Sequence, residues 1–365
     1  DTTNEEIYFD EKGVCNYCNN FYQNILPKWK KNLVESKILE NLIKKIKNNN
    51  NKNKYDCLIG VSGGIDSSYL AYLAKVKFNL NPLLFHVDAG WNTNNATVNI
   101  ANLMDNLNLD LITKVIDWET IKDLQLSFFK AQVPSLDTVQ DHAFFASLYN
   151  YAAKNKYKYI LTGANFATES IREPLEWHYH ASDLKQIKDI HKKFGKNTLK
   201  KFPQCDIFKY KIYYRYFKGI RVISPLNYIN YNKEEAMDFL EKEIDWKKYS
   251  HKHHESRFTK FYEGYWLSEK FGYDKRKVHF SSLILSNQMS REEALHKIKK
   301  SVYEDQDIDL EFDYISKKLG IEKNELLNLK EGKNKSHTDY KSNLRLIEIG
   351  TKVLQLLGKE KRIIV

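Results

Sequence analysis

The residues with the clearest capacity for chemistry lie in the run Ser-Gly-Gly-Ile-Asp-Ser-Ser at positions 62–68. Paired glycines let the backbone approach a ligand closely and point successive N–H groups at it. The sequence after the run predicts a helix, whose N-terminus adds partial positive charge, and the serines add hydroxyl donors. These features together predict a phosphate-binding loop. Its spacing fits neither the Gly-x-x-x-x-Gly-Lys-Ser/Thr loop nor the Gly-x-Gly-x-x-Gly loop.

The elements that must position this loop follow from an alternation of strands and helices. From about residue 55 to residue 231, five short β-branched or aliphatic runs alternate with segments of helical length. Such alternation predicts an α/β fold, a Rossmann-like, doubly wound parallel sheet that binds ligands at the carboxyl ends of its strands. The phosphate loop directly follows the first of these strands. The expected divisions are 1–50, a Cys-x-x-Cys segment with an amphipathic helix; 51–231, the α/β domain; and 232–365, a mainly helical region.

The composition is that of a globular protein, with 42% hydrophobic and 13% aromatic residues among 365. It contains no run of about 18 apolar residues, so we expect no transmembrane helix. Four cysteines are too few for a disulfide framework and favour a reducing, cytoplasmic setting. The net charge of +11 fits either nucleic acid or a small anion, but the Lys- and Asn-rich residues 44–55 are best read as a solvated linker.

Residues 62–68 match Ser-Gly-Gly-x-Asp-Ser, the pyrophosphate loop (PP-loop) of the N-type ATP pyrophosphatases, at the place in the fold where that superfamily has it. Further segments, among them PSLDTVQDHAFF, LTGANFATES and HHESRFTKFYEGYWLSEKFGYDKRK, resemble the bacterial N-acetyl sugar amidotransferases over about residues 1–300. Those enzymes convert an acetamido group on a surface-polysaccharide or flagellin sugar into an acetamidino group. The resemblance implies that ATP is cleaved to AMP and pyrophosphate while the acetamido oxygen is adenylated, and that ammonia then displaces AMP.

The resemblance also implies roles for residues around the nucleotide. Mg²⁺ is expected near Asp66, and residue Asp88 near the adenosine or the metal, although it could instead cap the following helix. Asp66 and Ser62 are expected to be catalytic. The residues expected to bind ATP and its pyrophosphate are Ser62, Gly63, Gly64, Asp66, Ser67, Ser68, Asp88, Gly163 and Asn165.

For the acetamido sugar, the resemblance points to residues on or after loops at the strand ends. Asp141 and His142 are expected to be catalytic, although Asp141 could be a helix N-cap and His142 a core histidine. The remaining contacts expected from these loops are Gln140, Glu169 and Arg172.

A basic segment interleaved with aromatic residues spans about 251–277. It suits a sugar carboxylate or a phosphate, with Arg257 offering a bidentate fork, and His254 and Arg276 are expected to bind substrate beside it. RNA binding and a solvated helix face are the alternatives for the segment. Residues 274–277 alone read as a solvated turn.

Cys15 and Cys18 form half of a zinc ribbon, and relatives that resemble this chain have a second Cys-x-x-Cys shortly before. Because the sequence begins at Asp1 rather than at Met, we expect a structural Zn²⁺ with two further ligands from a missing preceding segment, unless the site is incomplete. The sequence shows no glutaminase nucleophile. We therefore expect ammonia from a separate glutaminase subunit, with or without a channel-forming companion.

The sequence leaves the identity of the sugar open. A nonulosonic acid, such as pseudaminic or legionaminic acid, and a nucleotide-linked mannuronic acid derivative both fit. The main competing function is that of a PP-loop tRNA-modifying enzyme, either a thiolase or a lysidine-type ligase. Against it, no RNA-binding module is recognisable, so nucleic acid is not the expected partner. A protein that binds ATP without cleaving it is the remaining alternative.

Overall fold

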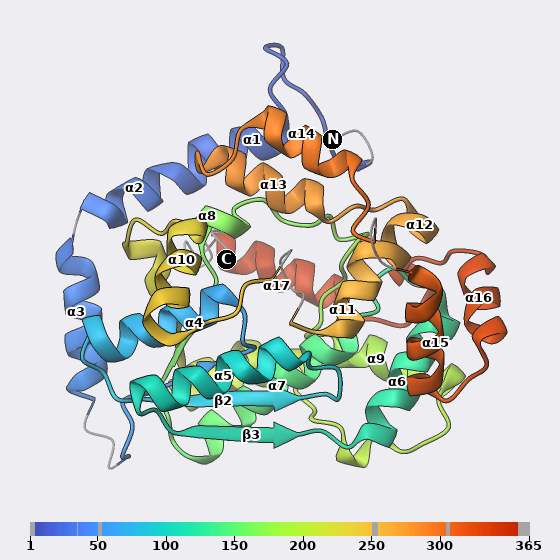
Figure 1. Cartoon of the computed structure of the whole chain (residues 1–365), viewed down its shortest axis with the longest axis horizontal. Coiled ribbons are helices and arrows are strands. Elements are labelled where there is room, and N and C mark those ends of the chain that lie inside the picture. Colours follow the sequence, from blue (N-terminus) through green and yellow to red (C-terminus); the bar gives the residue numbers. More distant parts are fainter. Residues whose placement is uncertain (1–3, 35, 50–52, 250–254, 304–306, 357–365) are drawn as a thin grey trace.

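The computed structural model describes residues 4–34, 36–49, 53–249, 255–303 and 307–356. Its centre is a five-stranded parallel sheet with the strand order β3-β2-β1-β4-β5 (Figure 1). The strands are β1 (Cys57–Gly60), β2 (Pro82–Asp88), β3 (Leu111–Val115), β4 (Tyr159–Leu161) and β5 (Arg221–Ile223). The predicted α/β fold with a parallel sheet is confirmed.

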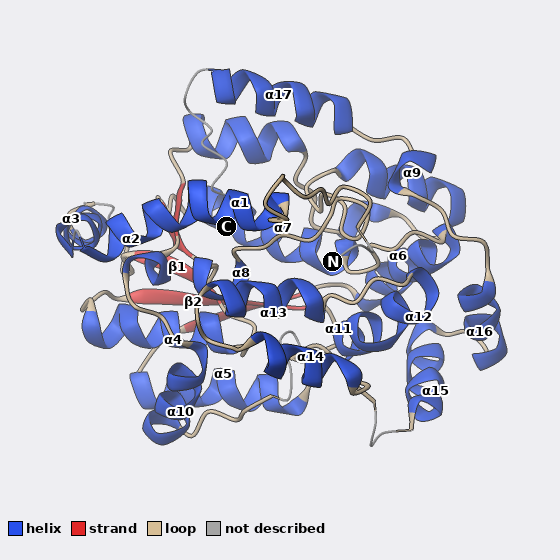
Figure 2. Ribbon diagram, turned by 90° about the horizontal axis from the view of Figure 1, so that it is seen from above, coloured by secondary structure: helices blue, strands red, loops and turns tan. Residues whose placement is uncertain are grey.

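Helices cover both faces of the sheet, because the central strands are apolar on both sides. Leu58 and Ile59 of β1 have no exposed surface, and residues 83–87 of β2 are all buried. Figure 2 shows α4 (Ile65–Tyr72) and α5 (Asn94–Leu107) on one side of the sheet and α7 (Thr138–Lys154) on the other. Continuous apolar runs of this kind are typical of parallel strands buried on both faces.

The other helices fall into three groups along the chain. The N-terminal helices are α1 (Asn16–Asn20), α2 (Leu26–Val34) and α3 (Ser36–Lys47). Those between or just after the strands are α6 (Trp118–Ala131), α8 (Phe166–Glu169), α9 (Leu184–Phe194) and α10 (Lys233–Ile244), with the π-helical segment η4 (Lys209–Phe217). The C-terminal region comprises α11 (Arg257–Phe261), a π-helical turn (Tyr262–Trp266), α12 (Leu267–Phe271), α13 (Arg276–Leu285), α14 (Arg291–Lys299), α15 (Ile308–Leu319), α16 (Lys323–Glu331) and α17 (Leu344–Leu356).

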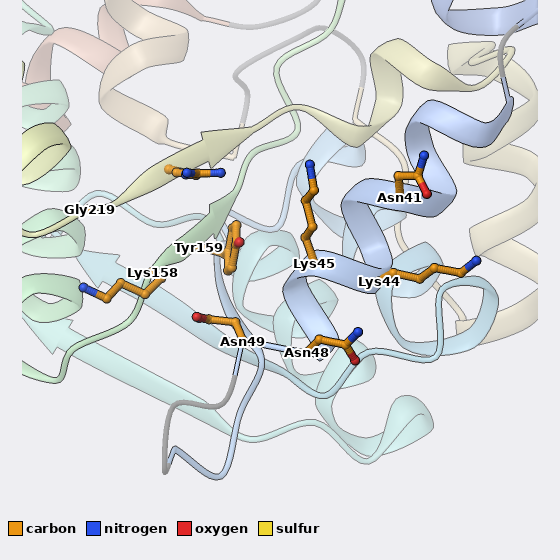
Figure 3. Close-up of a pocket in the computed structure, with 9 residues that line it drawn as sticks. Asn41, Lys44, Lys45, Asn48, Asn49, Lys158, Tyr159 and Gly219 are labelled. Carbon is orange, nitrogen blue, oxygen red and sulfur yellow. The ribbon is translucent and has the colours of Figure 1, made fainter.

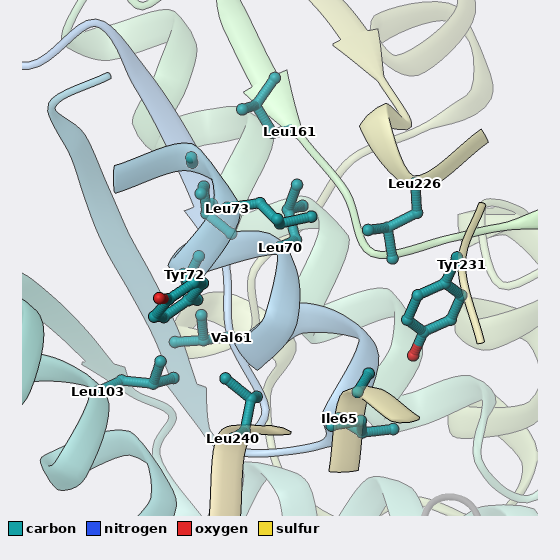
Figure 4. Close-up of a cluster of buried hydrophobic side chains, with 14 of the residues drawn as sticks. Val61, Ile65, Leu70, Tyr72, Leu73, Leu103, Leu161, Leu226, Tyr231 and Leu240 are labelled. Carbon is teal, nitrogen blue, oxygen red and sulfur yellow. The ribbon is translucent and has the colours of Figure 1, made fainter. Parts of the chain in front are cut away.

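One apolar cluster packs α4, α5 and α10 against the sheet (Figure 4). Leu70 of α4, Leu103 of α5 and Leu240 of α10 are fully buried within it. Because α10 shares this core, the expected division at residue 231 does not coincide with a break in packing, and the domain limits stay a prediction.

A second cluster joins the sheet to the C-terminal region. Trp91, which follows β2, packs on Phe258 of α11 with ring centroids 5.1 Å apart, and Phe258 in turn lies beside Phe129 of α6. Two backbone hydrogen bonds join residues 255–257 to the loop after β2. Thr93 N donates to Glu255 O (2.9 Å), and Arg257 N donates to Trp91 O (2.9 Å). The arrowheads of β2 and β3 point toward α11 and α6 (Figure 1), so the C-terminal region covers the carboxyl edge of the sheet.

No helix in the described part of the chain is both long enough and apolar enough to cross a membrane.

The burial of Leu240 yields a stability prediction. Leu240→Ala should lower the free energy of unfolding by about 2–5 kcal/mol, because it removes buried methyl groups and leaves a cavity between α10 and α4. Urea denaturation followed by circular dichroism measures the change. The matched control is Leu310→Ala, since Leu310 is 62% exposed and its truncation should change stability by under about 0.5 kcal/mol. Equal effects of the two substitutions would contradict this account of the core.

Candidate active site

The loop predicted to bind phosphate joins β1 to α4 in the structure. Gly63 has a φ of +83°, and a Cβ there would lie 2.6 Å from the carbonyl oxygen of Ala96, so only glycine fits. Two buried donors fix this bend, because Asn99 Nδ2 (3.1 Å) and Trp246 Nε1 (3.2 Å) both donate to the Gly63 carbonyl. Gly64 then caps α4 with its N–H groups facing the carboxyl edge of the sheet.

The end of β4 lies directly against the first turn of α4. A Cβ on Gly163 would lie 2.7 Å from the carbonyl carbon of Asp66 and 2.8 Å from the backbone nitrogen of Ser67. Asn165, which caps α8, donates to Asp66 Oδ1 (3.2 Å), and the hydroxyl of Tyr231 donates to the same oxygen (2.6 Å). The carboxylate of Asp66 is therefore held in place by two neighbours from outside the loop.

A carboxylate from the C-terminal region reaches the same loop. Ser62 Oγ donates to Glu255 Oε1 (3.0 Å), and that oxygen lies 2.7 Å from the position of a Cβ on Gly64. A loop suited to phosphate thus has an acidic side chain beside it, and a pyrophosphate group there needs a cation between itself and Glu255, or a movement of the side chain.

A cavity of about 600 Å³ opens at this edge of the sheet. The phosphate loop, the end of β4, the start of α7 and the C-terminal region all line it. Seven carboxylates line the cavity against two lysines, Lys233 and Lys275, and neither an arginine nor a cysteine of the described residues does so. The seven carboxylates belong to Asp66, Asp137, Asp141, Glu169, Glu173, Glu255 and Glu263.

Lys275 is the centre of a buried charge cluster in the cavity wall. It is 4% exposed, and its Nζ lies 2.7 Å from Glu263 Oε1 and 3.1 Å from Glu173 Oε1. Burial alone would lower the pKa of Lys275, but the two glutamates raise it well above its ordinary value, so the amine is charged. Burial raises the pKa of Asp137 well above its ordinary value, and Asp141 and Glu263 add to this.

The structure brings most of the predicted loop and sugar residues together at the cavity. Gly63, Ser68 and Asn165 belong to the loop or contact it without lining the cavity, and Asp88 instead accepts from Gly90 N (2.7 Å) in its own turn. The predicted residues that line the cavity are Ser62, Gly64, Asp66, Ser67, Gln140, Asp141, Gly163 and Glu169.

His142 lies inside the fold and does not line the cavity, so nothing in the structure supports its predicted catalytic role. It is fully buried, with Nδ1 2.6 Å from the carbonyl oxygen of Ala181 and Nε2 accepting from Cys205 N at 3.3 Å. Burial lowers its pKa to about 4, and its ring stacks on Phe202. Asp141 does line the cavity and is not the cap of α7, since Asp137 occupies that position.

The arginines expected to bind substrate do not line the cavity. Arg257 makes a two-point contact with Glu311 (3.1 and 3.0 Å) and lies over the ring of Tyr314. Arg276 bonds Asp274 and the carbonyls of residues 298 and 300. Arg172 lies outside the lining as well, and His254 falls outside the described residues.

Several cavity residues were missed by sequence reasoning. Residues 274–277 read as a solvated turn, yet Lys275 is buried, because two glutamates distant in sequence surround it. Glu255 belongs to the segment HHESRFTKFYEGYWLSEKFGYDKRK, which carries part of the family resemblance, so it could have been predicted as a site residue. Asp137 likewise stands within the quoted segment PSLDTVQDHAFF. Nothing in the local sequence signals Glu173, or Tyr231, which bonds Asp66 without lining the cavity.

The structure bears on two metal predictions, the Mg²⁺ near Asp66 and the zinc site at Cys15 and Cys18. Mg²⁺ commonly uses one or two carboxylates together with substrate phosphates and water, so Asp66 and Glu169 at the cavity suit it without a preformed cage. Cys15 and Cys18 lie together, with Cys18 N donating to Cys15 Sγ (3.4 Å), and burial raises the pKa of Cys18 to about 11. Among the described residues, no three or more His, Cys, Asp or Glu side chains lie close enough together to hold one metal ion. The zinc ribbon therefore stays a prediction.

A second hollow, of about 750 Å³, lies at the opposite edge of the sheet, where β4 and β5 begin (Figure 3). It is basic and open, and none of its lining residues comes from the phosphate loop. Its charged members are Lys44, Lys45, Lys158 and Arg221.

Comparison with known families agrees with this fold and site. Residues 36–205 match the NAD synthase family, which shares the PP-loop, and residues 255–354 match the family described as LPS biosynthesis protein WbpG-like, C-terminal domain. The chain thus combines an NAD synthase-like PP-loop domain with a WbpG-like C-terminal domain, and the resemblance to the PP-loop family of the lipopolysaccharide type is confirmed.

Individual relatives overlap only part of the chain. The uncharacterized protein MJ1599 of Methanocaldococcus jannaschii is 34% identical over 112 residues, which is 30% of this chain and 38% of that protein. An NH3-dependent NAD synthetase from Campylobacter jejuni is 19% identical, with a TM-score of 0.30, over 45% of this chain and 72% of its own. The U34-tRNA thiolase NcsA from Methanococcus maripaludis is 14% identical, with a TM-score of 0.33, over 69% of this chain and 77% of its own. NMN synthetase from Francisella tularensis is 18% identical, with a TM-score of 0.30, over 62% of this chain and 98% of its own.

The contact between Gly163 and α4 yields a prediction for nucleotide binding. Gly163→Ala should weaken ATP binding at least about tenfold, because the new methyl group must displace the backbone of Asp66 and Ser67, which is not a flexible neighbour. Isothermal titration with ATP and Mg²⁺ measures the change. Gly350→Ala is the matched control, since a Cβ there has no atom within 4 Å and should leave ATP affinity unchanged. Wild-type affinity in the Gly163 variant would show that this contact does not shape the loop.

Proposed function

We propose that this protein is an ATP-dependent amidotransferase that converts the acetamido group of an N-acetyl sugar into an acetamidino group. The observation that carries the proposal is the shared cavity. On one side lies the phosphate loop, and on the other an acid-rich wall without a thiol among the described residues. Such a wall suits a reaction whose nitrogen donor and product are cations, since ammonium is the common form of ammonia at neutral pH and an amidine product is protonated.

The reaction divides between the two sides of the cavity. The loop's N–H groups and Ser62 hold the pyrophosphate of ATP, and Asp66 would hold a Mg²⁺ ion that offsets its charge. AMP passes to the acetamido oxygen, which turns a poor leaving group into a good one. Ammonia then forms a bond to the same carbon as the bond to AMP breaks. The walls of the cavity limit the access of water to the adenylated intermediate.

The sugar is proposed to be acidic, either a nonulosonic acid or a nucleotide-linked mannuronic acid derivative, for surface polysaccharide or flagellin glycans. The match of residues 255–354 to an LPS-biosynthesis family supports this class. Because carboxylates outnumber lysines in the cavity, we place only the acetamido end of the sugar inside it. The anionic end then stays at the mouth, away from the acidic wall.

A tRNA-modifying enzyme is the second candidate, and the basic hollow at the opposite edge of the sheet favours it, since cations attract the nucleic-acid backbone. A thiolase, however, needs a sulfur carrier, and the acid-rich cavity offers no thiol from the described residues. Release of AMP that depends on RNA, instead of on an acetamido sugar, would favour this candidate.

The nucleotide products test the proposal. With Mg²⁺, ammonium and an acidic acetamido sugar, the protein should form AMP and pyrophosphate, and Ser62→Ala should lower the rate by about two orders of magnitude through lost contacts to the leaving group. Chromatography of the nucleotides gives both results. Ser336→Ala, in an exposed cap away from the cavity, is the matched control and should keep the wild-type rate. Formation of ADP and phosphate would refute the adenylation chemistry.

The nitrogen source gives a separate prediction. We propose that a glutaminase subunit supplies ammonia in the cell, with or without a channel-forming companion. The isolated chain should therefore turn over with ammonium salts and show no activity with glutamine, which mass spectrometry of the sugar product can follow. Glutamine hydrolysis by the purified chain would contradict this arrangement.

A further inference from the structure

The buried charge cluster in the cavity wall joins the two matched parts of the chain. Asp137 and Glu173 come from the NAD synthase-like part, and Glu263 and Lys275 from the WbpG-like part. All four line the same cavity as the phosphate loop. Asp137 is 5% exposed and is tied into this wall by bonds from Gln140 Nε2 (2.8 Å) and Thr259 Oγ1 (3.3 Å).

The charges of this cluster favour a cation over an anion. Lys275 offsets the charge of one of its two glutamates, and Asp141 adds a further carboxylate nearby. His178 lies 3.7 Å from Glu173 and 3.6 Å from Asp141, so the carboxylates outnumber the one lysine of the cluster even with this histidine beside them. A buried ion pair with a surplus negative charge is costly unless another cation or proton joins it. Asp137 is the group best placed to take a proton, because burial and the neighbouring carboxylates raise its pKa.

A second observation points to a small polar ligand at this place. Tyr262 is fully buried, and its hydroxyl has no hydrogen-bond partner within the described structure. Lys275, Asp137, Glu173 and Glu263 all act electrostatically on this hydroxyl, so it belongs to the same cluster. Tyr262 does not itself line the cavity, so its hydroxyl lies behind the cluster as one of several buried polar atoms without a partner among the described residues. A polar ligand held by the cluster would be the nearest group able to satisfy it.

We propose that the cluster formed by Asp137, Glu173, Glu263 and Lys275 is the nitrogen site, which binds ammonium and delivers ammonia to the adenylated sugar. This inference rests on the proposed function. Asp137 is its proton acceptor, and the surplus carboxylate charge attracts the incoming cation and then stabilises the amidinium product.

The proton and bond changes balance. As ammonium enters the cluster, its positive charge replaces the proton held by Asp137, and that proton leaves to solvent. Ammonium then gives one of its own protons to the Asp137 carboxylate, which leaves neutral ammonia and a carboxylic acid. The nitrogen lone pair forms a bond to the imidate carbon, the bond from that carbon to the AMP oxygen breaks, and the electron pair leaves with AMP. The sugar keeps the new nitrogen as an amidinium cation. Asp137 keeps the proton taken from ammonium, and the protonated acid is the state that meets the next ammonium ion.

The experiment separates the two half-reactions. Adenylation needs no ammonium, so sugar-dependent exchange of labelled pyrophosphate into ATP reports on the first half alone. The complete reaction, titrated with ammonium chloride, reports on the second. Asp137→Asn should leave the exchange rate within about twofold of wild type and lower kcat/KM for ammonium by about 10²-fold, the usual contribution of a proton-transfer group.

The variant should fold, because asparagine resembles the protonated acid. A carboxyl whose pKa is raised by folding destabilises the folded state as the pH rises through that pKa, so Asp137→Asn should keep or raise Tm at pH 8. Glu263→Gln, which leaves Glu173 paired with Lys275, is a second variant and should raise KM for ammonium without changing KM for ATP. Asp238→Asn, an exposed aspartate on α10 that pairs with Lys248, is the matched control and should change none of these values.

The outcomes are distinguishable. Loss of exchange in folded Asp137→Asn, or a rise in KM for the sugar alone, would overturn the nitrogen site and assign the cluster to sugar binding. An unchanged dependence on ammonium in both variants would overturn it as well. Absence of sugar-dependent exchange in the wild-type protein would instead refute the proposed function, and the nitrogen site with it.

Discussion

The close packing of the end of β4 against the first turn of α4 is the contact on which the rest of the site depends. Gly163 leaves no space for a side chain between itself and the backbone of Asp66 and Ser67, so the phosphate loop and the loop after β4 have one fixed relation. Asn165 caps α8 through its side-chain oxygen and donates a hydrogen bond to Asp66 through its side-chain nitrogen. The start of α8 and the carboxylate expected near Mg²⁺ are therefore held in a fixed relative position. Loops at adjacent carboxyl ends of a parallel sheet are brought together by the fold itself, and here that juxtaposition makes the nucleotide side of the cavity.

The C-terminal region supplies the other side of the cavity and changes its electrostatic character. A phosphate loop alone would make a positive site, suited to an anion. Glu255 beside the loop and Glu263 beside Lys275 make the remainder negative. An adenylating enzyme that must also accept ammonium benefits from this division, because each half of the reaction meets charges of the opposite sign.

Sequence reasoning reached the fold and the loop because both depend on local patterns. The alternation of strands and helices predicted the parallel sheet, and the paired glycines after the first strand predicted the phosphate loop. It reached Gln140, Asp141 and Glu169 through resemblance alone. It did not predict the charge cluster, because the ion-pair partners of Lys275 come from other elements. Glu173 lies more than one hundred positions and Glu263 twelve positions before it in the chain. For the same reason His142 and Arg257 were predicted to bind or act on substrate. In the folded chain their side chains instead make hydrogen bonds with residues distant in sequence, His142 with Cys205 and Arg257 with Glu311.

The central claim is that the acetamido oxygen itself receives AMP, and an oxygen label follows that atom directly. An acidic acetamido sugar carrying oxygen-18 in its acetamido carbonyl would be incubated with the protein, ATP, Mg²⁺ and ammonium, and the products examined by mass spectrometry. The account predicts one oxygen-18 atom in the phosphate of AMP for each acetamidino sugar formed, with unlabelled pyrophosphate. Label released into water, or recovered in pyrophosphate or in inorganic phosphate, would contradict it.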